Sequence, residues 1–357
     1  MTDSSTARDL SSMPYEPPPR WRPPVALPTP RPQDAEAEAP TQVVDYKPVD
    51  FEPLDHDAVD SPAAENPPAL IEKLGPTGRV LPHFPAPPLL TSHGPARVIA
   101  LCNQKGGVGK TTAAINLGAA IAEHGRRVLL VDFDPQGSLS VGLGVAPHEL
   151  DLSVYNLLLQ RDVTLAEVVR PTRVPGMDLV PANIDLSAAE MQLVNEVARE
   201  QVLQSVLRPA MNTYDVILID CQPSLGLLTI NALTAAHGVI VPMECEFFAL
   251  RGLAMLTETI DKVQQRLNPD LRIEGILATM YDARTIHTRE VLTRVVERFG
   301  DAVFHTVINR TIRFPETTVA GEPITTYDTG SAGAAAFRQL AAEVLARGAL
   351  VGAGAAQ

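Results

Sequence analysis

Cysteine is scarce in this sequence of 357 residues, which contains only Cys102, Cys221 and Cys245. Because the count is odd and no two of them are spaced as C-x-x-C, the cysteines argue against a disulfide framework, and a reducing, cytoplasmic compartment is expected. Long apolar runs are also missing, since none reaches the roughly 18 residues that a transmembrane helix needs. The N-terminus has no basic stretch followed by an apolar core, so no signal peptide is predicted.

Positive charge is in short supply as well. The chain has 29 Lys and Arg residues against 42 Asp and Glu residues, which gives a net charge of −13. An acidic chain of this kind does not bind polyanions over its whole surface, although a local basic patch can still do so.

Proline is concentrated at the start of the chain, where residues 1–95 contain 21 of the 32 prolines, with 14 acidic and 7 basic residues. Proline favours extended backbone, and few periodic apolar residues are present to offset the entropy lost on ordering. We predict that residues 1–94 form a disordered, proline-rich acidic arm. The arm is either a passive solvated tail or a docking segment that binds a partner through Trp21 or the Phe84–Leu90 patch.

From Arg97 onward, apolar strands alternate with helical patterns. Strands are predicted within 97–104 and 126–134, and at 177–182, 215–220, 238–243 and 273–281; helices are predicted at 110–124, 185–208, 225–236, 249–267, 286–299 and 332–347. Strands that are apolar throughout and alternate with helices indicate an α/β fold, a doubly wound and mostly parallel sheet with helices on both faces. This domain is expected over residues 95–350, with a flexible tail at 351–357.

The stretch CNQKGGVGKTT, residues 102–112, joins the first predicted strand to the first predicted helix. It matches the end of the pattern G-x-x-x-x-G-K-[ST], but Gln104 stands where the first glycine is expected. A glycine-rich turn before a helix N-terminus binds anions through inward N–H groups and the helix dipole. The sequence therefore predicts the nucleotide site of a P-loop NTPase, formed by Lys105, Gly106, Gly107, Val108, Gly109, Lys110, Thr111 and Thr112. In such a site Lys110 reaches the β- and γ-phosphates of ATP, and the Thr111 hydroxyl ligates Mg²⁺.

Aspartates stand at the ends of two predicted strands. Asp132 and Asp134 close LLVDFD, and Asp220 closes YDVILID. The carboxyl ends of strands form the ligand crevice of such sheets, where carboxylates need a cation or a water to hold. Asp220 is therefore the Walker B candidate, which holds Mg²⁺ through water.

The stretch KGGVGKTT resembles the deviant phosphate loop of the ParA/MinD group of ATPases. In that group the early lysine reaches across a nucleotide sandwich homodimer to the phosphates of the other subunit, and the resemblance gives this role to Lys105. It also implies that Asp134 positions the attacking water and that Asp132, in the switch region, is a further Mg²⁺ ligand beside Thr111 and Asp220. Lys105, Lys110 and Asp134 are thus the expected catalytic residues. Alternatively, Lys105 only raises the local positive potential, although any lysine beside phosphates can neutralise developing charge.

Later stretches resemble chromosome-partitioning ParA proteins in particular, among them DCQPSLGLLTINAL and GEPITTYDTG. The resemblance implies that the ATP-bound dimer binds DNA without sequence preference, through Arg284, Arg313 and Arg310. The alternative for these arginines is surface salt bridges, because residues 262–338 contain 10 basic and 9 acidic residues. The chain departs from the family at Gln222, where proline is usual, and in NRT at 309–311, near the segment that covers the adenine in relatives.

We therefore expect an ATP- and Mg²⁺-dependent chromosome or plasmid partitioning or positioning ATPase. A ParB-like protein would activate it, and it would be cytoplasmic and associated with the nucleoid. One alternative is a nucleotide-switched regulatory adaptor of replication or chromosome condensation with little turnover, and a second is MinD-like placement of the division site.

Two other branches of the group fit the sequence less well. MinD proteins bind membrane through a basic amphipathic C-terminal helix, whereas this chain ends in the glycine-broken LAAEVLARGALVGAGAAQ, so no membrane partner is expected. The nitrogenase iron-protein branch holds a cluster with cysteines, but Cys102 and Cys221 are interpreted here as packing residues.

Overall fold

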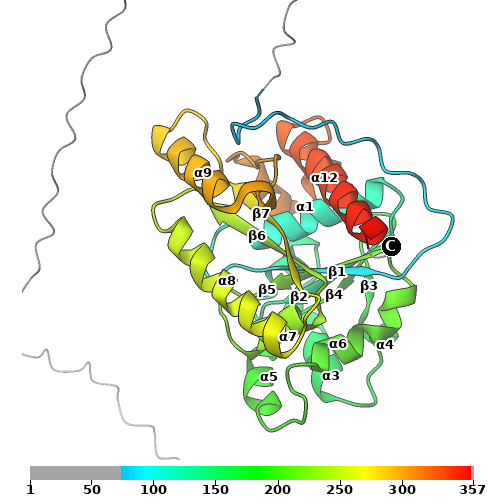
Figure 1. Ribbon diagram of the computed structural model, residues 1–357. Coiled ribbons are helices and arrows are strands. Elements are labelled where there is room, and N and C mark those ends of the chain that lie inside the picture. The colour runs from blue at the N-terminus through cyan, green and yellow to red at the C-terminus, as the bar shows by residue number, and fades with distance from the viewer. Residues whose placement is uncertain (1–73, 355–357) are drawn as a thin grey trace, which may run out of the picture. The chain divides into compact units, whose positions relative to one another are not determined.

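Strands that are mainly apolar form one sheet in the computed structural model, which describes residues 74–354 (Figure 1). Among these residues the sheet has seven strands in the order β3-β4-β2-β5-β1-β6-β7, and only β3 runs antiparallel to its neighbour. The strands are β1 Arg97–Leu101, β2 Val128–Phe133, β3 Arg170–Pro171, β4 Met177–Val180, β5 Val216–Cys221, β6 Gly238–Glu244 and β7 Arg272–Thr279. The predicted doubly wound, mostly parallel sheet is confirmed.

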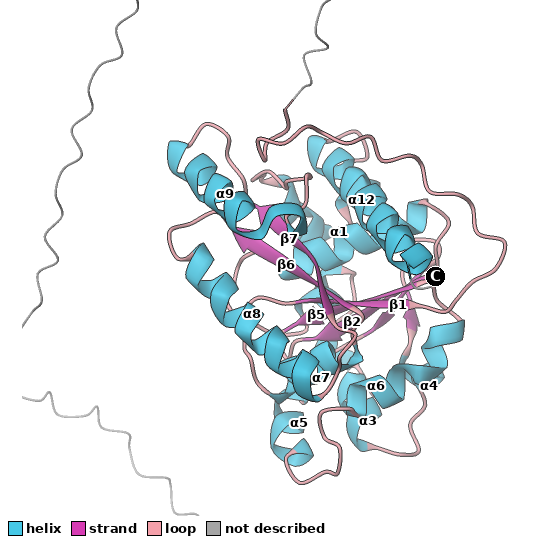
Figure 2. Cartoon of the chain, in the orientation of Figure 1, coloured by secondary structure: helices cyan, strands magenta, loops and turns pink. Residues whose placement is uncertain are grey.

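Alternate residues of each central strand enter two different hydrophobic cores. In β5, Ile217 and Ile219 belong to one core, and Val216 and Leu218 belong to the other. Because successive side chains of a strand point to opposite faces, both faces must be covered by helices, as Figure 2 shows.

Helices cover the two faces separately. On one side lie α1 Lys110–Glu123 and α12 Ala332–Gly354, and on the other lie α3 Val154–Leu159, α7 Leu227–Ala235 and α8 Ala249–Arg266. The remaining helices are α2 Ser138–Gly142, α4 Leu165–Val168, α5 Leu186–Leu193, α6 Val202–Leu207, α9 Ile286–Phe299, α10 Arg313–Ala320 and α11 Ile324–Tyr327, with 3-10 turns at η1 Pro147–Glu149, η2 Arg208–Asn212 and η3 Gly300–Ala302. Within residues 74–354, no helix has both the length and the apolar character needed to span a bilayer.

The single helix predicted at 185–208 is wrong, because the chain forms α5 and α6 with an irregular connection between them. Ala198 in this connection has a φ of 54°, which no α-helix allows. The side chain of Asn231 holds the broken backbone: its Oδ1 accepts from Leu203 N at 3.1 Å, and its Nδ2 donates to Arg199 O at 2.8 Å. A distant amide thus replaces helical hydrogen bonds, and local periodicity cannot reveal it.

Part of the predicted disordered arm contacts the domain. Arg79 Nη2 donates to Val303 O at 2.6 Å, the Phe84 ring lies edge-on to His305, and His93 Nδ1 lies 2.8 Å from Asp215 Oδ2. The domain's own carbonyls and carboxylate hold residues 74–94, so these contacts begin before the predicted boundary at residue 95. The rest of the arm, including Trp21, and the last three residues of the predicted tail lie outside the described residues.

Candidate active site

The predicted phosphate loop lies between the end of β1 and the start of α1. Gly107 and Gly109 have φ values of 75° and 82°, in the left-handed region that favours glycine. The Thr279 hydroxyl of β7 donates to Val108 O at 2.8 Å and anchors the loop to the sheet. None of the described side chains caps α1, so the N–H groups of its first turn remain available to an anion.

Lys110 is the first residue of α1, and only 7% of its surface is exposed. Its Nζ lies 3.4 Å from Lys105 O, so the ammonium group faces back into the loop. A buried positive charge is costly unless it is paired with negative charge. The loop therefore combines free backbone donors with a buried cation, and this arrangement fits phosphate.

Asp220 connects the end of β5 to the start of α1. Its Oδ2 accepts a hydrogen bond from Thr111 Oγ1 at 2.7 Å, while its buried Oδ1 has no partner among the described residues. In the sheet Asp220 is paired with Asp132 of β2. Burial first, and then the charge of Asp132, raise the pKa of Asp220 to about 8. An unpartnered carboxylate oxygen beside a hydroxyl fits a hard divalent cation, which would offset this buried negative charge.

Asp132 lies beside Asp220 but faces another element. Its Oδ2 accepts from Ser140 N at 2.8 Å and from Ser140 Oγ at 2.6 Å, which ties β2 to α2. Burial raises the pKa of Asp132 to about 6, although the hydrogen bonds from Ser140 oppose this shift. Of the three predicted cation ligands, Thr111 and Asp220 therefore contact each other, whereas Asp132 contacts α2.

Asp134, the predicted water-positioning residue, follows β2 directly and is half-buried. Its Oδ1 accepts from Gln136 N at 3.0 Å, so the following turn holds one carboxylate oxygen in place. That turn ends at Gly137, which has a φ of 62° and precedes α2. The carboxylate thus lies on the same edge of the sheet as Asp220, where the parallel strands β2 and β5 both end.

Lys105 contacts carboxylates of its own chain. Its Nζ donates to Glu244 Oε2 at 3.2 Å and forms a second ion pair with Glu246, just after β6. Arg310 Nη2 donates to the other oxygen of Glu244 at 2.6 Å. Two of the predicted functional cations therefore meet at Glu244.

The predicted DNA-contacting arginines are all paired within the chain. Arg284 donates from Nη2 to Asp282 Oδ2 at 2.7 Å, and Arg313 donates from Nη1 to Glu316 Oε2 at 3.0 Å. The surface salt bridges that the sequence left as an alternative are thus present. Exposed pairs of this kind are weak and break readily for a stronger anion.

A pocket that the sequence did not predict opens beside the loop. Its volume is about 330 Å³ and its lining is mainly apolar. The lining includes Gly109, Thr112, Met280, Ile308, Phe314 and Pro315. Its position next to the helix N-terminus and its apolar walls suit a planar base attached to the bound phosphates. Two sequence signals lie near it: Gly109 and Thr112 belong to the predicted nucleotide site, and the unusual NRT segment at 309–311 also lines the pocket.

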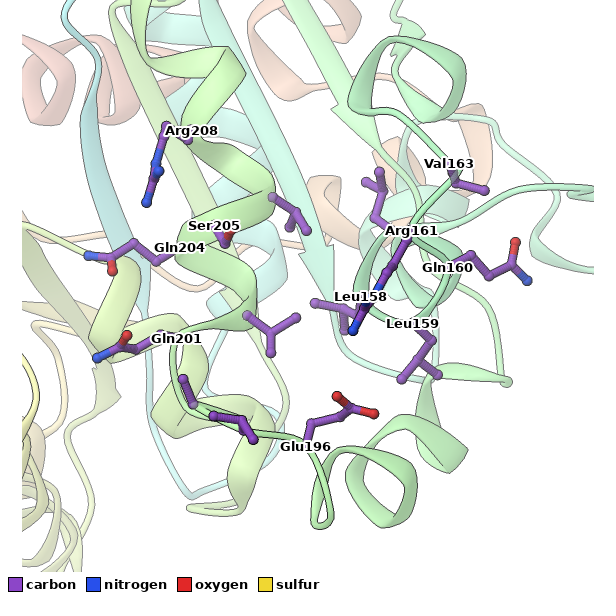
Figure 3. A pocket seen from close by; sticks show the side chains of 15 residues that line it. Leu158, Leu159, Gln160, Arg161, Val163, Glu196, Gln201, Gln204, Ser205 and Arg208 are labelled. Carbon is purple, nitrogen blue, oxygen red and sulfur yellow. The ribbon is translucent and has the colours of Figure 1, made fainter.

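A second cavity, of about 490 Å³, lies between α3, α6 and the connection after α5 (Figure 3). Figure 3 shows Arg161, Glu196, Gln201 and Ser205 around it. No residue of the phosphate loop and none of the three aspartates lines this cavity. The candidate active site is therefore placed at the loop, where donors, a buried cation and an unpartnered carboxylate come together.

Ligand-free protein should lose stability as the pH rises from about 5 to about 8. The folded protein holds the Asp220 proton until about pH 8, whereas the unfolded chain releases it near pH 4. In this window the unfolded state binds fewer protons, so Asp220 lowers the unfolding free energy by up to about 1.4 kcal/mol per pH unit, while Asp132, with its pKa of about 6, adds to the slope only below about pH 6. Asp220→Asn should flatten this slope, as urea unfolding at a series of pH values would measure.

Asp282→Asn is the matched control for this experiment. Hydrogen bonds from Arg284 lower the pKa of Asp282 to about 2, so it stays ionised throughout the window. The control variant should keep the slope of the unchanged protein. Equal slopes for all three proteins would show that Asp220 does not carry the raised pKa.

This chain is similar to a protein family, to several known sequences and to solved structures. A protein-family model described as an AAA domain matches residues 96–273, which include the loop and all three aspartates. An uncharacterized protein of Mycobacterium tuberculosis is 64% identical over 274 residues, covering 77% of this chain and 86% of that relative. The chromosome-partitioning ATPase Soj of Treponema pallidum is 49% identical over 251 residues, covering 70% of this chain and 98% of that relative. A crystal structure of cobyrinic acid a,c-diamide synthase from Mycobacterium smegmatis, with bound ATP analog and magnesium, is 46% identical with a TM-score of 0.63, covering 69% of this chain and 92% of that chain.

Proposed function

The chain belongs to the ParA/Soj family of chromosome-partitioning ATPases, and on this premise we propose that it couples ATP-driven homodimerisation to DNA binding without sequence preference. In this proposal a ParB-like protein stimulates hydrolysis and thereby releases the DNA, and the protein acts on the nucleoid in the cytoplasm. One observation carries the nucleotide part: Thr111 donates to Asp220 while the second, buried oxygen of Asp220 has no partner among the described residues.

Binding of ATP begins with the phosphates. The N–H groups of the loop and of the first turn of α1 bind the phosphate oxygens, and the ammonium group of Lys110 forms ion pairs with the β- and γ-phosphates. The apolar pocket lined by Met280 and Phe314 receives the base. These contacts hold the nucleotide with its γ-phosphate at the ends of β2 and β5.

Thr111 and Asp220 would hold Mg²⁺, Asp220 directly or through a water. When bound, the ion neutralises negative charge on the phosphate oxygens. The hydroxyl of Thr111 lies on the first turn of α1, so cation and phosphate contacts are made from the same helix end. Asp132 supports this arrangement indirectly, because it fixes α2 beside the site.

Asp134 positions the attacking water. The bond from Gln136 N holds one of its oxygens, and this leaves the other oxygen to accept a proton from water. Positioning and electrostatic stabilisation account for most catalysis of phosphoryl transfer, so a carboxylate fixed by its own turn suits this task.

Lys105 acts across the dimer in this proposal. In the single chain it is bound to Glu244 and Glu246, so it must leave both carboxylates to reach the nucleotide of a partner subunit. Exposed ion pairs of this type contribute at most about 1 kcal/mol each. A bound triphosphate carries enough negative charge to attract the lysine away from them.

DNA binding is tested by a gel shift of the purified protein on arbitrary DNA, with ATP, with ADP and without nucleotide. A shift should appear only with ATP. The double variant Arg284→Glu with Arg313→Glu should weaken it and reduce the salt dependence by roughly one released ion for each arginine removed. Its nucleotide affinity should not change, because neither residue lines the loop or the base pocket.

Lys262→Glu with Arg266→Glu is the charge-matched control, since both residues are exposed on α8. If the double variant binds DNA as well as this control at low salt, the DNA contacts lie elsewhere. If no protein shifts DNA in any nucleotide state, the nucleotide-switched adaptor becomes the better description. Stimulation of ATP turnover by a ParB-like protein distinguishes partitioning from that adaptor.

A second candidate function rests on one comparison, the 46% identity to a protein named cobyrinic acid a,c-diamide synthase. An amide synthase would use the same loop to activate a carboxylic acid with ATP. Its ATP turnover would depend on a polycarboxylic acid and an amide donor rather than on DNA. Measuring turnover with each addition separates the two functions.

A further inference from the structure

Two thiols lie directly beneath the candidate site and take no part in the proposed reaction. The Sγ atoms of Cys102 and Cys221 are 2.9 Å apart, and each residue is 1% exposed. Cys102 follows β1, which leads into the phosphate loop, and Cys221 is the last residue of β5, directly after Asp220. The two thiols are therefore in contact between the strand that leads to the loop and the strand that carries the cation-binding carboxylate.

Strand geometry already suits a bond between these sulfurs. Leu101 pairs with Asp220 in the parallel ladder, so Cys102 and Cys221 are the next pair along the two strands. Neighbouring strands lie about 4.8 Å apart, within the range of Cα separations that a disulfide spans. Both side chains enter the same hydrophobic core, so they point to the same face of the sheet. Closing the bond needs a small movement of the side chains rather than a rearrangement of the fold.

We propose that Cys102 and Cys221 form a reversible disulfide that weakens nucleotide and cation binding at the neighbouring site. The oxidant is hydrogen peroxide. One thiol is oxidised to a sulfenic acid as the peroxide O–O bond breaks and water leaves. The second sulfur then attacks the first, the S–O bond breaks, and a second water leaves. Two thiols thus lose two electrons and two protons to one hydrogen peroxide, and two waters form.

The covalent link acts on the site through the residues next to the cysteines. Asn103, after Cys102, accepts a hydrogen bond from Lys105 N at 3.0 Å and donates to Pro242 O at 2.7 Å, which positions the start of the loop. Asp220, before Cys221, carries the unpartnered oxygen. A cross-link that shifts both neighbours should weaken Mg²⁺-dependent nucleotide binding by about 10- to 100-fold, as changes around metal ligands do. This effect rests on the proposed function, but formation of the disulfide does not.

Burial controls when the bond forms. Because both thiols are almost fully covered, an oxidant reaches them only when the segments over the strand ends open. Bound nucleotide holds these segments together, so ATP with Mg²⁺ should slow oxidation. A disulfide that forms and is reduced again is the kind that reducing compartments use for sensing.

The test treats the protein with hydrogen peroxide, blocks free thiols and maps the tryptic peptides without reduction. Residues 98–105 carry Cys102, whereas Cys221 and Cys245 fall in one longer peptide, so the mapping uses the Cys245→Ala background. The expected product is one cross-linked pair of peptides that dithiothreitol separates. Titration of a fluorescent ATP analogue with Mg²⁺ should show about 10- to 100-fold weaker binding before reduction and full recovery afterwards.

Single variants Cys102→Ala and Cys221→Ala should bind nucleotide normally and lose the sensitivity to peroxide, and either one suffices if the other fails to fold. Thiols that stay free, or that form only sulfinic acids or links between chains, would overturn the proposal. If the cross-linked protein binds the nucleotide as tightly as the reduced protein does, the proposal that the disulfide weakens nucleotide binding is wrong. Reduced protein that binds no nucleotide would instead contradict the proposed function, while the peptide map still decides whether the disulfide forms.

Discussion

Lys110→Ala is expected to remove most of the affinity for nucleotide. Lys110 is buried, with 7% of the residue exposed, and its ammonium group faces into the loop, where no bulk water can replace it beside the phosphates. Removing one member of a buried, hydrogen-bonded charge pair costs about 2–5 kcal/mol, which corresponds to an affinity loss of roughly 30-fold to several thousand-fold. Isothermal titration with ATP and Mg²⁺ measures this loss directly.

Lys262→Ala provides the matched control, because Lys262 lies exposed on α8 and, within residues 74–354, pairs with Glu258 one turn away. That variant should bind ATP like the unchanged protein. If the Lys110→Ala variant kept its ATP affinity, the assignment of the phosphate loop as the ATP-binding site would be wrong. The thermal unfolding of both variants should be compared first, so that loss of binding is not confused with loss of the fold.

Asp134→Ala is expected to stop hydrolysis while ATP binding persists. Loss of a carboxylate that orients and accepts a proton from water typically lowers the rate by about 10²- to 10⁴-fold. Because Asp134 contacts neither Thr111 nor the base pocket, its removal leaves the contacts that bind ATP in place. The variant should therefore accumulate as an ATP-bound dimer, which size-exclusion chromatography with light scattering detects.

An exposed aspartate of α8 gives the control, and Asp261→Ala should hydrolyse ATP normally. Normal turnover by Asp134→Ala would take this residue out of the mechanism. If the variant neither hydrolyses ATP nor dimerises with it, Asp134 is needed for ATP binding rather than for positioning the water.

Local sequence patterns were sufficient wherever the physical constraint is local. Runs of apolar residues predicted the six parallel strands, because strands that are covered on both faces are apolar along most of their length. The glycines and the two lysines of 105–112 predicted the turn between β1 and α1, because positive φ values favour glycine at Gly107 and Gly109. Asp132 and Asp220 were predicted at strand ends, and the sheet then paired them.

Patterns failed where distant residues decide the local structure. The break between α5 and α6 depends on Asn231, which lies some 30 residues away along the chain. The contacts of 74–94 depend on backbone carbonyls and a carboxylate far along the chain, such as Val303 O and Asp215. The base pocket joins the loop to Met280, Phe314 and Phe337, which share no motif.

The sequence by itself determined the class of site: a phosphate loop, a Walker B aspartate and a family whose members are ATPases. Each of these features depends on residue types and spacing within a short stretch, so it can be recognised without knowledge of the fold. Tertiary structure alone decided the pairing of side chains. It brought Thr111 to Asp220, directed Lys105 to Glu244, engaged Asp132 with Ser140 and placed Cys102 against Cys221. The physical reason is that hydrogen bonds, ion pairs and sulfur contacts depend on distances of a few ångströms between strand ends, and the parallel sheet sets these distances.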